Sequence, residues 1–219
     1  MREPIIYTGG ELQTNAYLIA GKKSYVCIDA PQGITSFLIQ RKIEVDALLL
    51  THGHFDHIWE AHLIEKTFQC PVYIHPADYN LLHNSGGAAY MGLKIAIPAP
   101  KEIIPLPVLA GSSIHWGCSG IEFILFHIPG HSPGSVAFYV SRLHAVFCGD
   151  ILFSGSIGRT DLPGGNTASL VEGIKNYLFS LPDQTLVYPG HGPSTTILKE
   201  KETNPYLNSQ QEGKSSFFV

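Results

Sequence analysis

Short apolar runs separated by glycine-rich turns occupy the first half of the chain. Runs of this length and pattern are typical of β-strands. The predicted strands cover residues 4–8, 15–20, 24–28, 45–50 and 70–75. The run VDALLL, at residues 45–50, is almost entirely apolar, which indicates a strand that is buried on both faces.

Helices are predicted between these strands, over residues 33–42 and 76–83. A further helix is expected to begin at His57, because the apolar residues behind it recur at helical spacing, at Ile58, Ala61, Ile64 and Phe68. Residues 85–107 are rich in Gly, Pro and Ala and have little periodicity. We interpret them as a long loop or lid near an active site.

The second half of the chain repeats this plan more loosely. Its predicted strands cover residues 121–128, 135–140, 145–148 and 185–188. Its predicted helices cover residues 166–181 and 194–203. The first of these helices is amphipathic, and Ser169 and Glu172 have the spacing of a capping box.

Strands therefore come in two batches, each closed by helices. This order predicts an α+β fold in which two sheets pack face to face with helices outside. The sequence contains no repeat with a fixed period, which disfavours a solenoid or propeller. We expect one domain over residues 1–208 and a loose tail over residues 209–219.

The composition narrows the classes of protein further. A net charge of -4 over 219 residues disfavours a general nucleic-acid binder. The sequence has no uninterrupted apolar stretch long enough for a membrane span, and its first residues have none of signal-peptide length. The four cysteines, Cys27, Cys70, Cys118 and Cys148, form no CxxC motif and are expected to be reduced thiols in the core. These features together predict a cytoplasmic protein.

Histidine is unusually frequent, with 11 residues, and four candidate metal ligands follow the run at 45–50 directly: His52, His54, Asp56 and His57. The end of a buried strand gives such ligands a rigid base that opens into a crevice. His52 and His54 can project in the same direction from an extended loop, whereas Asp56 and His57 point elsewhere once the helix begins. One short loop can therefore serve two neighbouring metal ions.

Three further candidates each follow an apolar run and are flanked by Gly or Pro. His131 lies in PGHSPGS, Asp150 in FCGD and His191 in YPGHGP. Glycine permits a sharp turn and proline stiffens it, so each of these side chains can be held still, as a metal site requires.

The number of ligands suits two divalent metal ions. The first ion would take three nitrogens, from His52, His54 and His131. The second ion would take two nitrogens and one oxygen, from Asp56, His57 and His191. Asp150 can bridge the two, and zinc is the expected metal, with iron and manganese as alternatives. The other histidines are expected not to bind metal: His62, His75, His83, His115, His127 and His144.

The motifs THGHFDH, PGHSPGS, CGD and PGHG resemble those of the metallo-β-lactamase fold superfamily, from about Ile5 to Leu207. Within that stretch, GDILFSGSIGRTDLPGG and YPGHGPSTTILKEKETNPYL resemble the glyoxalase II, or hydroxyacylglutathione hydrolase, branch. The resemblance implies a four-layer αββα sandwich of two mixed sheets with a binuclear site on one edge. It also implies hydrolysis of thioesters such as S-lactoylglutathione, with Asp56 and Asp150 as catalytic ligands.

Two departures from the glyoxalase II pattern are visible. That branch usually carries a further C-terminal helical domain, so this chain is similar to the short, single-domain glyoxalase II-like bacterial hydrolases. The branch also often has a basic residue, and an aromatic residue two positions later, in the loop after the bridging aspartate. Here Arg159 matches the basic position, but Asp161 replaces the aromatic residue. Arg159 could bind a substrate carboxylate or could pair with Asp161.

The expected mechanism uses a water shared by two ions about 3.5 Å apart, whose pKa falls toward 7. The resulting hydroxide attacks the thioester carbonyl, and a thiolate, whose conjugate thiol has a pKa of about 8.5, leaves with little acid catalysis. Asp29, at the end of VCID, is expected to orient a ligating histidine, and Cys148 to be buried packing. The expected partner is a small-molecule thioester, with no nucleic acid and no membrane, and the protein is expected to be a monomer or a weak homo-oligomer.

The main alternative is a persulfide dioxygenase-like enzyme with one iron held by two His and one Asp, a group that also carries a GRTD segment. Other members of the superfamily are disfavoured. A β-lactamase with a cysteine ligand has it where Asp150 stands, and a flavodiiron oxidase usually has Glu where His54 stands. A tRNA-processing nuclease usually carries an added RNA-binding arm, and intact ligands disfavour a non-catalytic binding module.

Overall fold

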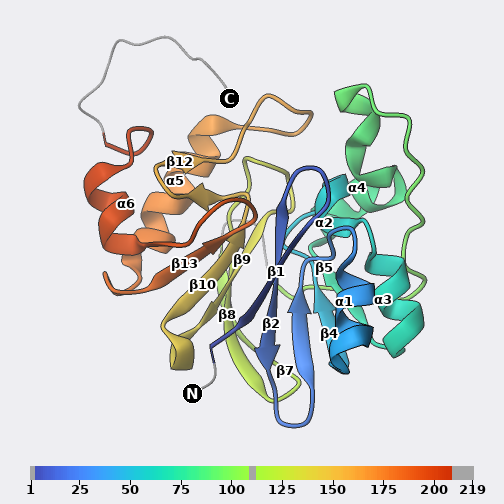
Figure 1. Ribbon diagram of the computed structural model, residues 1–219. Helices are drawn as coiled ribbons and strands as arrows, with labels where there is room; N and C mark the ends of the chain where they lie inside the picture. The colour runs from blue at the N-terminus through green and yellow to red at the C-terminus, as the bar shows by residue number, and fades with distance from the viewer. Residues whose placement is uncertain (1–2, 109–111, 209–219) are drawn as a thin grey trace.

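Two six-stranded sheets face each other in the computed structural model, which describes residues 3–108 and 112–208 (Figure 1). The first sheet has the order β1-β2-β3-β4-β5-β6. Its strands are β1 (Ile5–Gly9), β2 (Thr14–Ala20), β3 (Tyr25–Ile28), β4 (Val45–Leu49), β5 (Val72–Ile74) and β6 (Ile103–Pro105). The pairs β1–β2 and β2–β3 are antiparallel, whereas the pairs β3–β4, β4–β5 and β5–β6 are parallel.

The second sheet has the order β14-β13-β10-β9-β8-β7. Its strands are β7 (Ser113–Cys118), β8 (Ile121–His127), β9 (Val136–Val140), β10 (Ala145–Gly149), β13 (Leu186–Pro189) and β14 (Thr195–Thr196). Only the β10–β13 pair is parallel among these strands. Between β10 and β13 the chain adds a two-stranded hairpin, β11 (Leu152–Phe153) and β12 (Ser156–Ile157).

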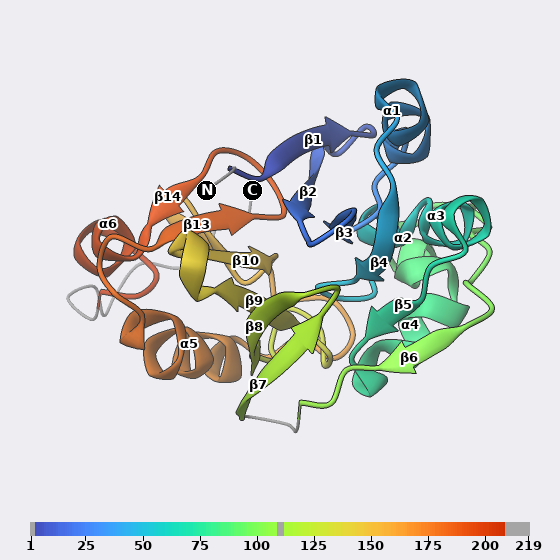
Figure 2. The same ribbon diagram turned by 90° about the horizontal axis from the view of Figure 1, so that it is seen from below.

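Helices cover the outer face of each sheet (Figure 2). The first sheet is covered by α1 (Ile34–Arg41), α2 (Phe55–Ile58), α3 (Ala61–Phe68) and α4 (Tyr79–His83). The second is covered by α5 (Thr167–Asn176) and α6 (Ile197–Thr203). This arrangement confirms the predicted αββα sandwich of two mixed sheets. Among the residues that the structure describes, no helix is long and apolar enough to cross a membrane.

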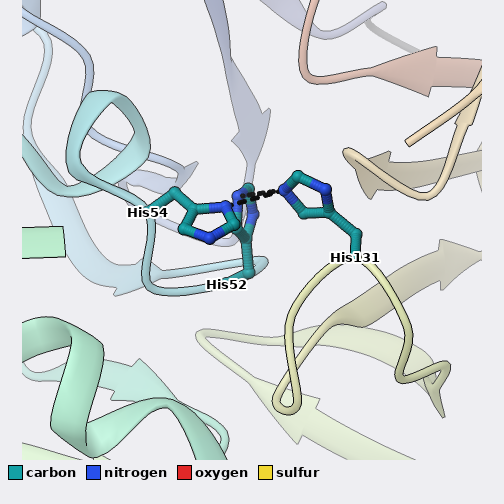
Figure 3. A group of neighbouring side chains, drawn as sticks. All are labelled: His52, His54 and His131. Carbon is teal, nitrogen blue, oxygen red and sulfur yellow. Dashed lines mark hydrogen bonds between the residues drawn. The ribbon is translucent and has the colours of Figure 1, made fainter. Parts of the chain in front are cut away.

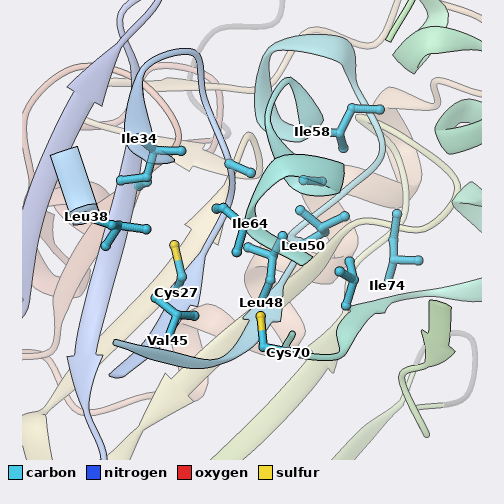
Figure 4. Packing of buried hydrophobic residues seen from close by; sticks show 14 of the residues in the cluster. Cys27, Ile34, Leu38, Val45, Leu48, Leu50, Ile58, Ile64, Cys70 and Ile74 are labelled. Carbon is cyan, nitrogen blue, oxygen red and sulfur yellow. The ribbon is translucent and has the colours of Figure 1, made fainter. Parts of the chain in front are cut away.

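Strand β4 shows how the apolar pattern builds these layers. Side chains alternate between the two faces of a strand. Ala47 and Leu49 therefore pack in the cluster between the two sheets, whereas Leu48 packs in the cluster under the helices. The helices contribute Ile34, Leu38, Ile58 and Ile64 to that outer cluster (Figure 4). A strand buried on both faces was the prediction for this run, and its burial confirms it.

Several predicted helices have different bounds. The helix expected over 194–203 begins at Ile197, because Thr195 and Thr196 form β14. The helix expected to open at His57 begins at Phe55 and ends at Ile58, and a second helix begins at Ala61. The break falls near Glu60, whose N–H donates to the carbonyl of Ala30 instead of continuing a helical ladder. Its carboxylate accepts the N–H groups of Gly33 and Thr35 at the start of α1.

The helix predicted over 166–181 ends at Asn176, and a 3-10 turn follows over Leu178–Ser180. Its N-cap is Asn166, whose side chain accepts the N–H of Ser169 at 3.0 Å. The proposed capping box of Ser169 and Glu172 was therefore wrong, because the helix begins one turn earlier.

The predicted loop over 85–107 contains more structure than expected, with a 3-10 helix over Ser85–Met91 and strand β6. Strand β7 was not predicted, because most of its residues are exposed and lack the expected alternation. The predicted loose tail, 209–219, lies outside the described residues.

The loops that carry the candidate ligands all leave the carboxyl ends of strands. They follow β4, β8, β10 and β13, whose ends meet at one edge of the two sheets. Residues from both halves of the chain converge there.

Candidate metal centre

Three histidine nitrogens meet at the edge of the sandwich, from His52, His54 and His131 (Figure 3). His54 Nδ1 lies 2.7 Å from His131 Nε2, which lies 3.2 Å from His52 Nε2. His52 and His54 come from the loop after β4, and His131 comes from the loop between β8 and β9. All three side chains are buried. Three nitrogens that point at one another offer a cation a ready set of imidazole ligands.

A second group of donor atoms adjoins the first and consists of Asp56, His57 and His191. Asp56 Oδ2 lies 3.2 Å from His191 Nε2 and 3.4 Å from His57 Nε2. Asp56 and His57 lie in α2, while His191 follows β13. The group therefore brings together two nitrogens and one carboxylate.

The carboxylate of Asp150 lies between the two groups. Its Oδ2 lies 3.5 Å from Nε2 of His131 and 3.5 Å from Nε2 of His191. Its Oδ1 lies 3.2 Å from Nε2 of His57. One carboxylate thus faces both groups, which is the position that a bridging ligand would take.

Hydrogen bonds on the far side of three rings orient the ring lone pairs. Nδ1 of His57 donates to Oδ2 of Asp29 at 2.8 Å, and Nδ1 of His131 donates to the carbonyl of Arg159 at 2.9 Å. Nδ1 of His191 donates to the carbonyl of Leu12 at 3.0 Å. Because these oxygens only accept hydrogen bonds, the neutral rings keep their protons on Nδ1. The lone pairs on Nε2 therefore point into the centre, as metal ligation requires.

Two buried atoms of the centre have no hydrogen-bond partner among the described residues. They are Nε2 of His57 and Oδ1 of Asp150, which face each other without hydrogen-bond geometry. Buried polar groups are nearly always satisfied, so such a pair needs an explanation. A divalent cation would supply it, and the imidazole and carboxylate donors present suit zinc, iron or manganese.

The local electrostatics differ between the two groups. Burial and the neighbouring histidines lower the pKa of His52 well below its ordinary value and that of His54 to about 3. Both rings are therefore neutral ligands at pH 7. Burial would also lower the pKa of His57, but the carboxylates of Asp56, Asp150 and Asp29 raise it well above its ordinary value.

The same balance holds for His191 and its partners. Burial alone would lower the pKa of His191, but hydrogen bonds to Asp150 and Asp56 raise it to about 10. Burial alone would raise the pKa of Asp56, but the charges of His57 and His191 hold it at about 2. Without a cation, the positive charges of protonated His57 and His191 balance the carboxylates of Asp56 and Asp150. A cation would replace those protons.

Asp29 braces the loop that carries the histidines. Besides the bond to His57, its carboxylate accepts the N–H and the hydroxyl of Thr51, each at 2.8 Å. Asp29 has a φ of 62°, a conformation that Asp and Asn tolerate better than most residues. In this position its carboxylate would keep the His57 ring oriented toward a cation.

Asp78 is a contributor that the sequence analysis missed. Its carboxylate is fully buried and contacts the loops on either side of the first group of histidines. Burial raises the pKa of this carboxyl group, and hydrogen bonds oppose that shift. The sequence did contain a signal for Asp78, which follows β5 shortly. Because β5 runs parallel to β4, the two strands end at the same edge of the sheet, so Asp78 lies near the loop that carries His52 and His54.

Arg159 forms a two-pronged ion pair with Asp161. Its Nε donates to Oδ1 at 2.7 Å and one terminal nitrogen donates to Oδ2 at 2.6 Å. Both side chains are largely exposed. Of the two roles left open for Arg159, the structure therefore displays the pair with Asp161. Its backbone carbonyl holds His131, as described above.

The remaining histidines and cysteines lie outside the centre. Within the described ranges, the donor groups that could hold a metal contain none of the six histidines expected not to ligate. His75 and His127 stack on each other, with ring centroids 4.0 Å apart. Cys148 is fully buried in the cluster under α5, which confirms its expected packing role.

Comparison with known proteins identifies the family. Residues 9–191 match the model of the Metallo-beta-lactamase superfamily. The chain is 36% identical over 206 residues to the Bacillus subtilis protein named Probable metallo-hydrolase YqgX, covering 91% of this chain and 94% of that protein. It is 34% identical over 202 residues to Hydroxyacylglutathione hydrolase GloC of Haemophilus influenzae, covering 90% and 94%.

Solved structures of metallo-β-lactamase-like proteins are also similar to this chain. BLEG-1 B3 metallo-beta-lactamase has a TM-score of 0.83 at 35% identity, over 94% of this chain and 100% of that one. TTHA1623 in a di-iron-bound form has a TM-score of 0.80 at 40% identity, over 93% and 100%. ETHE1 from Myxococcus xanthus has a TM-score of 0.69 at 26% identity, over 93% and 84%. This chain therefore belongs to the metallo-β-lactamase superfamily, as a glyoxalase II-like member.

Proposed function

We propose that this protein is a metal-dependent thioester hydrolase whose catalytic domain spans residues 1–208. The observation that carries the proposal is the single carboxylate of Asp150 facing two groups of donor atoms. His52, His54 and His131 would hold one divalent cation. Asp56, His57 and His191 would hold a second. Similarity to GloC, which is named a hydroxyacylglutathione hydrolase, supports a thioester as substrate.

The bound cations would supply Lewis-acid polarisation of the carbonyl and activation of water. The chain itself supplies orientation. Asp29 holds His57 in one tautomer, and the carbonyls of Arg159 and Leu12 do the same for His131 and His191. Because a thiolate is a good leaving group, the reaction needs no side chain as a strong general acid. The site accordingly requires no Ser–His or Cys–His pair.

Zinc is the proposed metal, and iron is the main alternative, since TTHA1623 is described in a di-iron-bound form. The second candidate function is a mononuclear iron oxygenase that acts on glutathione persulfide. Two observations support this oxygenase as the second candidate: the GRTD sequence of Gly158–Asp161 and the structural similarity to ETHE1. An oxygenase consumes O₂, whereas a hydrolase does not.

The test is anaerobic hydrolysis by the purified protein, with metal analysis of the same sample. The substrates are S-lactoylglutathione, S-acetyl-N-acetylcysteamine and a β-lactam. We expect thioester cleavage that needs no O₂ and falls to the background rate in Asp150→Ala. Asp183→Ala, a change at an exposed aspartate, should retain the rate. O₂ uptake with glutathione persulfide and no thioester cleavage would instead establish the oxygenase, and cleavage of the β-lactam alone would establish a lactamase.

A further inference from the structure

A cavity of about 410 Å³ opens beside the second group of donor atoms. Asp56 lines it, and so does Thr14, whose hydroxyl donates to Oδ2 of Asp56 at 2.7 Å. Asp56 is therefore shared by the wall of the cavity and the second group of donor atoms. Its volume lies at the lower end of the range for sites that bind small molecules.

Apolar side chains from three separate segments form most of the wall. They are Leu12 from the β1–β2 turn, Phe55 and Trp59 from the region of α2, and Met91, Leu93 and Ile95 from the loop after α4. Leu12, Met91 and Leu93 are each about two-fifths exposed, at 45%, 41% and 39%. Exposed apolar side chains that gather around one cavity are typical of a binding site.

The charges around the cavity are acidic. Glu11 and Asp56 line it, and no Lys or Arg is among the lining residues in the described part of the chain. Lys94 lies between Leu93 and Ile95 in the sequence but does not line the cavity. Arg159 is already paired with Asp161. A bound cation would balance the charge of Asp56, so Glu11 is the acidic group that a ligand would meet on this wall. A ligand with carboxylates would be repelled by Glu11 and would find no Arg or Lys of the kind that recognises carboxylates.

We propose that this cavity binds an apolar arm of the substrate, so that the preferred thioesters carry an aliphatic or aromatic group and no carboxylate near the reacting carbonyl. This inference rests on the proposed thioesterase function and narrows its substrate class. The thioester carbonyl would lie at the metal centre and the arm would extend past Asp56 along Leu12 and Trp59. Glutathione, with two carboxylates, would be a poor arm for this cavity.

Two substrate series distinguish the acyl arm from the thiol arm. The first varies the acyl group on N-acetylcysteamine from acetyl to hexanoyl, and the second varies the thiol of a lactoyl thioester from ethanethiol to hexanethiol, with S-lactoylglutathione for comparison. We expect kcat/KM of the metal-loaded enzyme to rise at least about tenfold along one series. The series that rises identifies the arm.

Leu12→Ala is the test variant, and Leu198→Ala is its matched control, because Leu198 is 43% exposed on α6 and does not line the cavity. Leu12→Ala should reduce the long-to-short ratio of kcat/KM about tenfold, and Leu198→Ala should leave it unchanged. Glu11→Lys should raise kcat/KM for S-lactoylglutathione relative to the hexyl thioester. A flat ratio in the parent enzyme, or equal effects of the two leucine changes, would overturn the inference while leaving the thioesterase function intact.

A binding measurement separates the inference from catalysis. The thioether S-hexyl-N-acetylcysteamine cannot be hydrolysed, and Trp59 reports its binding by fluorescence in a Trp116→Phe background, since the chain has two tryptophans. The hexyl thioether should bind at least about tenfold tighter than the methyl thioether, and Leu12→Ala should remove that difference. Binding that depends on Leu12 without thioester cleavage would overturn the proposed function alone. Equal binding of both thioethers would overturn the apolar-arm inference.

Discussion

The carboxylate of Asp78 accepts a hydrogen bond of 2.8 Å from the N–H of Gly53, the residue between His52 and His54. The same carboxylate accepts the hydroxyl of Ser132 at 2.7 Å and the N–H of Gly134 at 2.6 Å. One fully buried carboxylate thus joins the loop after β4 to the loop between β8 and β9. These are the two loops that supply the first group of histidines.

Replacing Asp78 should therefore affect both stability and metal binding. Asp78→Ala leaves the buried N–H groups of Gly53 and Gly134 without an acceptor, and we expect a loss of about 3 kcal/mol or more in the free energy of unfolding. Urea denaturation of the metal-free protein measures that loss, and a competing chelator measures the metal affinity. Asp183→Ala, at a 56% exposed aspartate, should change stability by less than about 0.5 kcal/mol. If the two variants unfold alike, the bracing role of Asp78 is refuted.

Asp29→Asn tests how the carboxylate of Asp29 supports His57, with little change in the size of the side chain. Asn tolerates the φ of 62° at this position, so the backbone should keep its conformation. The neutral amide weakens the hold on Nδ1 of His57, and we expect the affinity for the second cation to fall about 10- to 100-fold. Isothermal titration with zinc measures this. Asp46→Asn, at an exposed position of β4, is the matched control, and an equal affinity of both variants would contradict the prediction.

Gly190 lies so close to the centre that a methyl group has no room. A Cβ there would contact Oδ1 of Asp150 and would lie 2.6 Å from Cε1 of His57. We expect Gly190→Ala to displace these ligands and to lower kcat about a hundredfold. Steady-state kinetics and metal content per chain test this. Gly117→Ala, which meets only the flexible carboxylate of Glu122 at 3.3 Å, should match the parent protein, and normal activity of Gly190→Ala would show that the centre can shift.

The raised pKa values predict that metal binding releases protons. In the metal-free protein the pKa of His191 is about 10 and that of His57 is raised well above its ordinary value. Both rings are therefore protonated on both nitrogens and positively charged at pH 7. A cation must displace protons from them, and affinity should therefore increase as the pH rises from 7 toward 9. Calorimetry in two buffers with different ionisation enthalpies counts the released protons. Binding that releases none, or that is independent of pH, would contradict this assignment of charge.

The same shift has a consequence for the metal-free fold. Because the pKa of His191 is higher in the folded protein than its ordinary value of 6.5, protonation stabilises the folded state. That contribution is complete below about pH 6.5 and is lost as the pH rises toward 10. Thermal unfolding of the metal-free protein at pH 6 and pH 9 should show the lower Tm at pH 9. Loading with zinc should remove this dependence, because the cation takes the place of the protons.

Local pattern was enough to predict much of the architecture. The apolar run at β4 predicted a strand buried on both faces, and Gly and Pro around His131, Asp150 and His191 predicted sharp turns after strands. Both signals depend on residues adjacent in the chain, because strand periodicity and turn conformation are properties of short segments. The start of α2 was placed two residues late, and the break between α2 and α3 was missed, because it depends on a hydrogen bond from the N–H of Glu60 to the distant carbonyl of Ala30.

The sequence by itself determined which chemical groups are available to a metal and that they follow strand ends. Only the tertiary structure decided how those groups are oriented and what surrounds them. The carbonyl of Leu12 holds His191 across 179 positions, and Asp78 joins two loops that no local pattern connects. The apolar side chains of the cavity likewise come from three separate segments. Such contacts depend on how the sheets and helices pack, and packing is a property of the whole chain, which the periodicity of one segment does not encode.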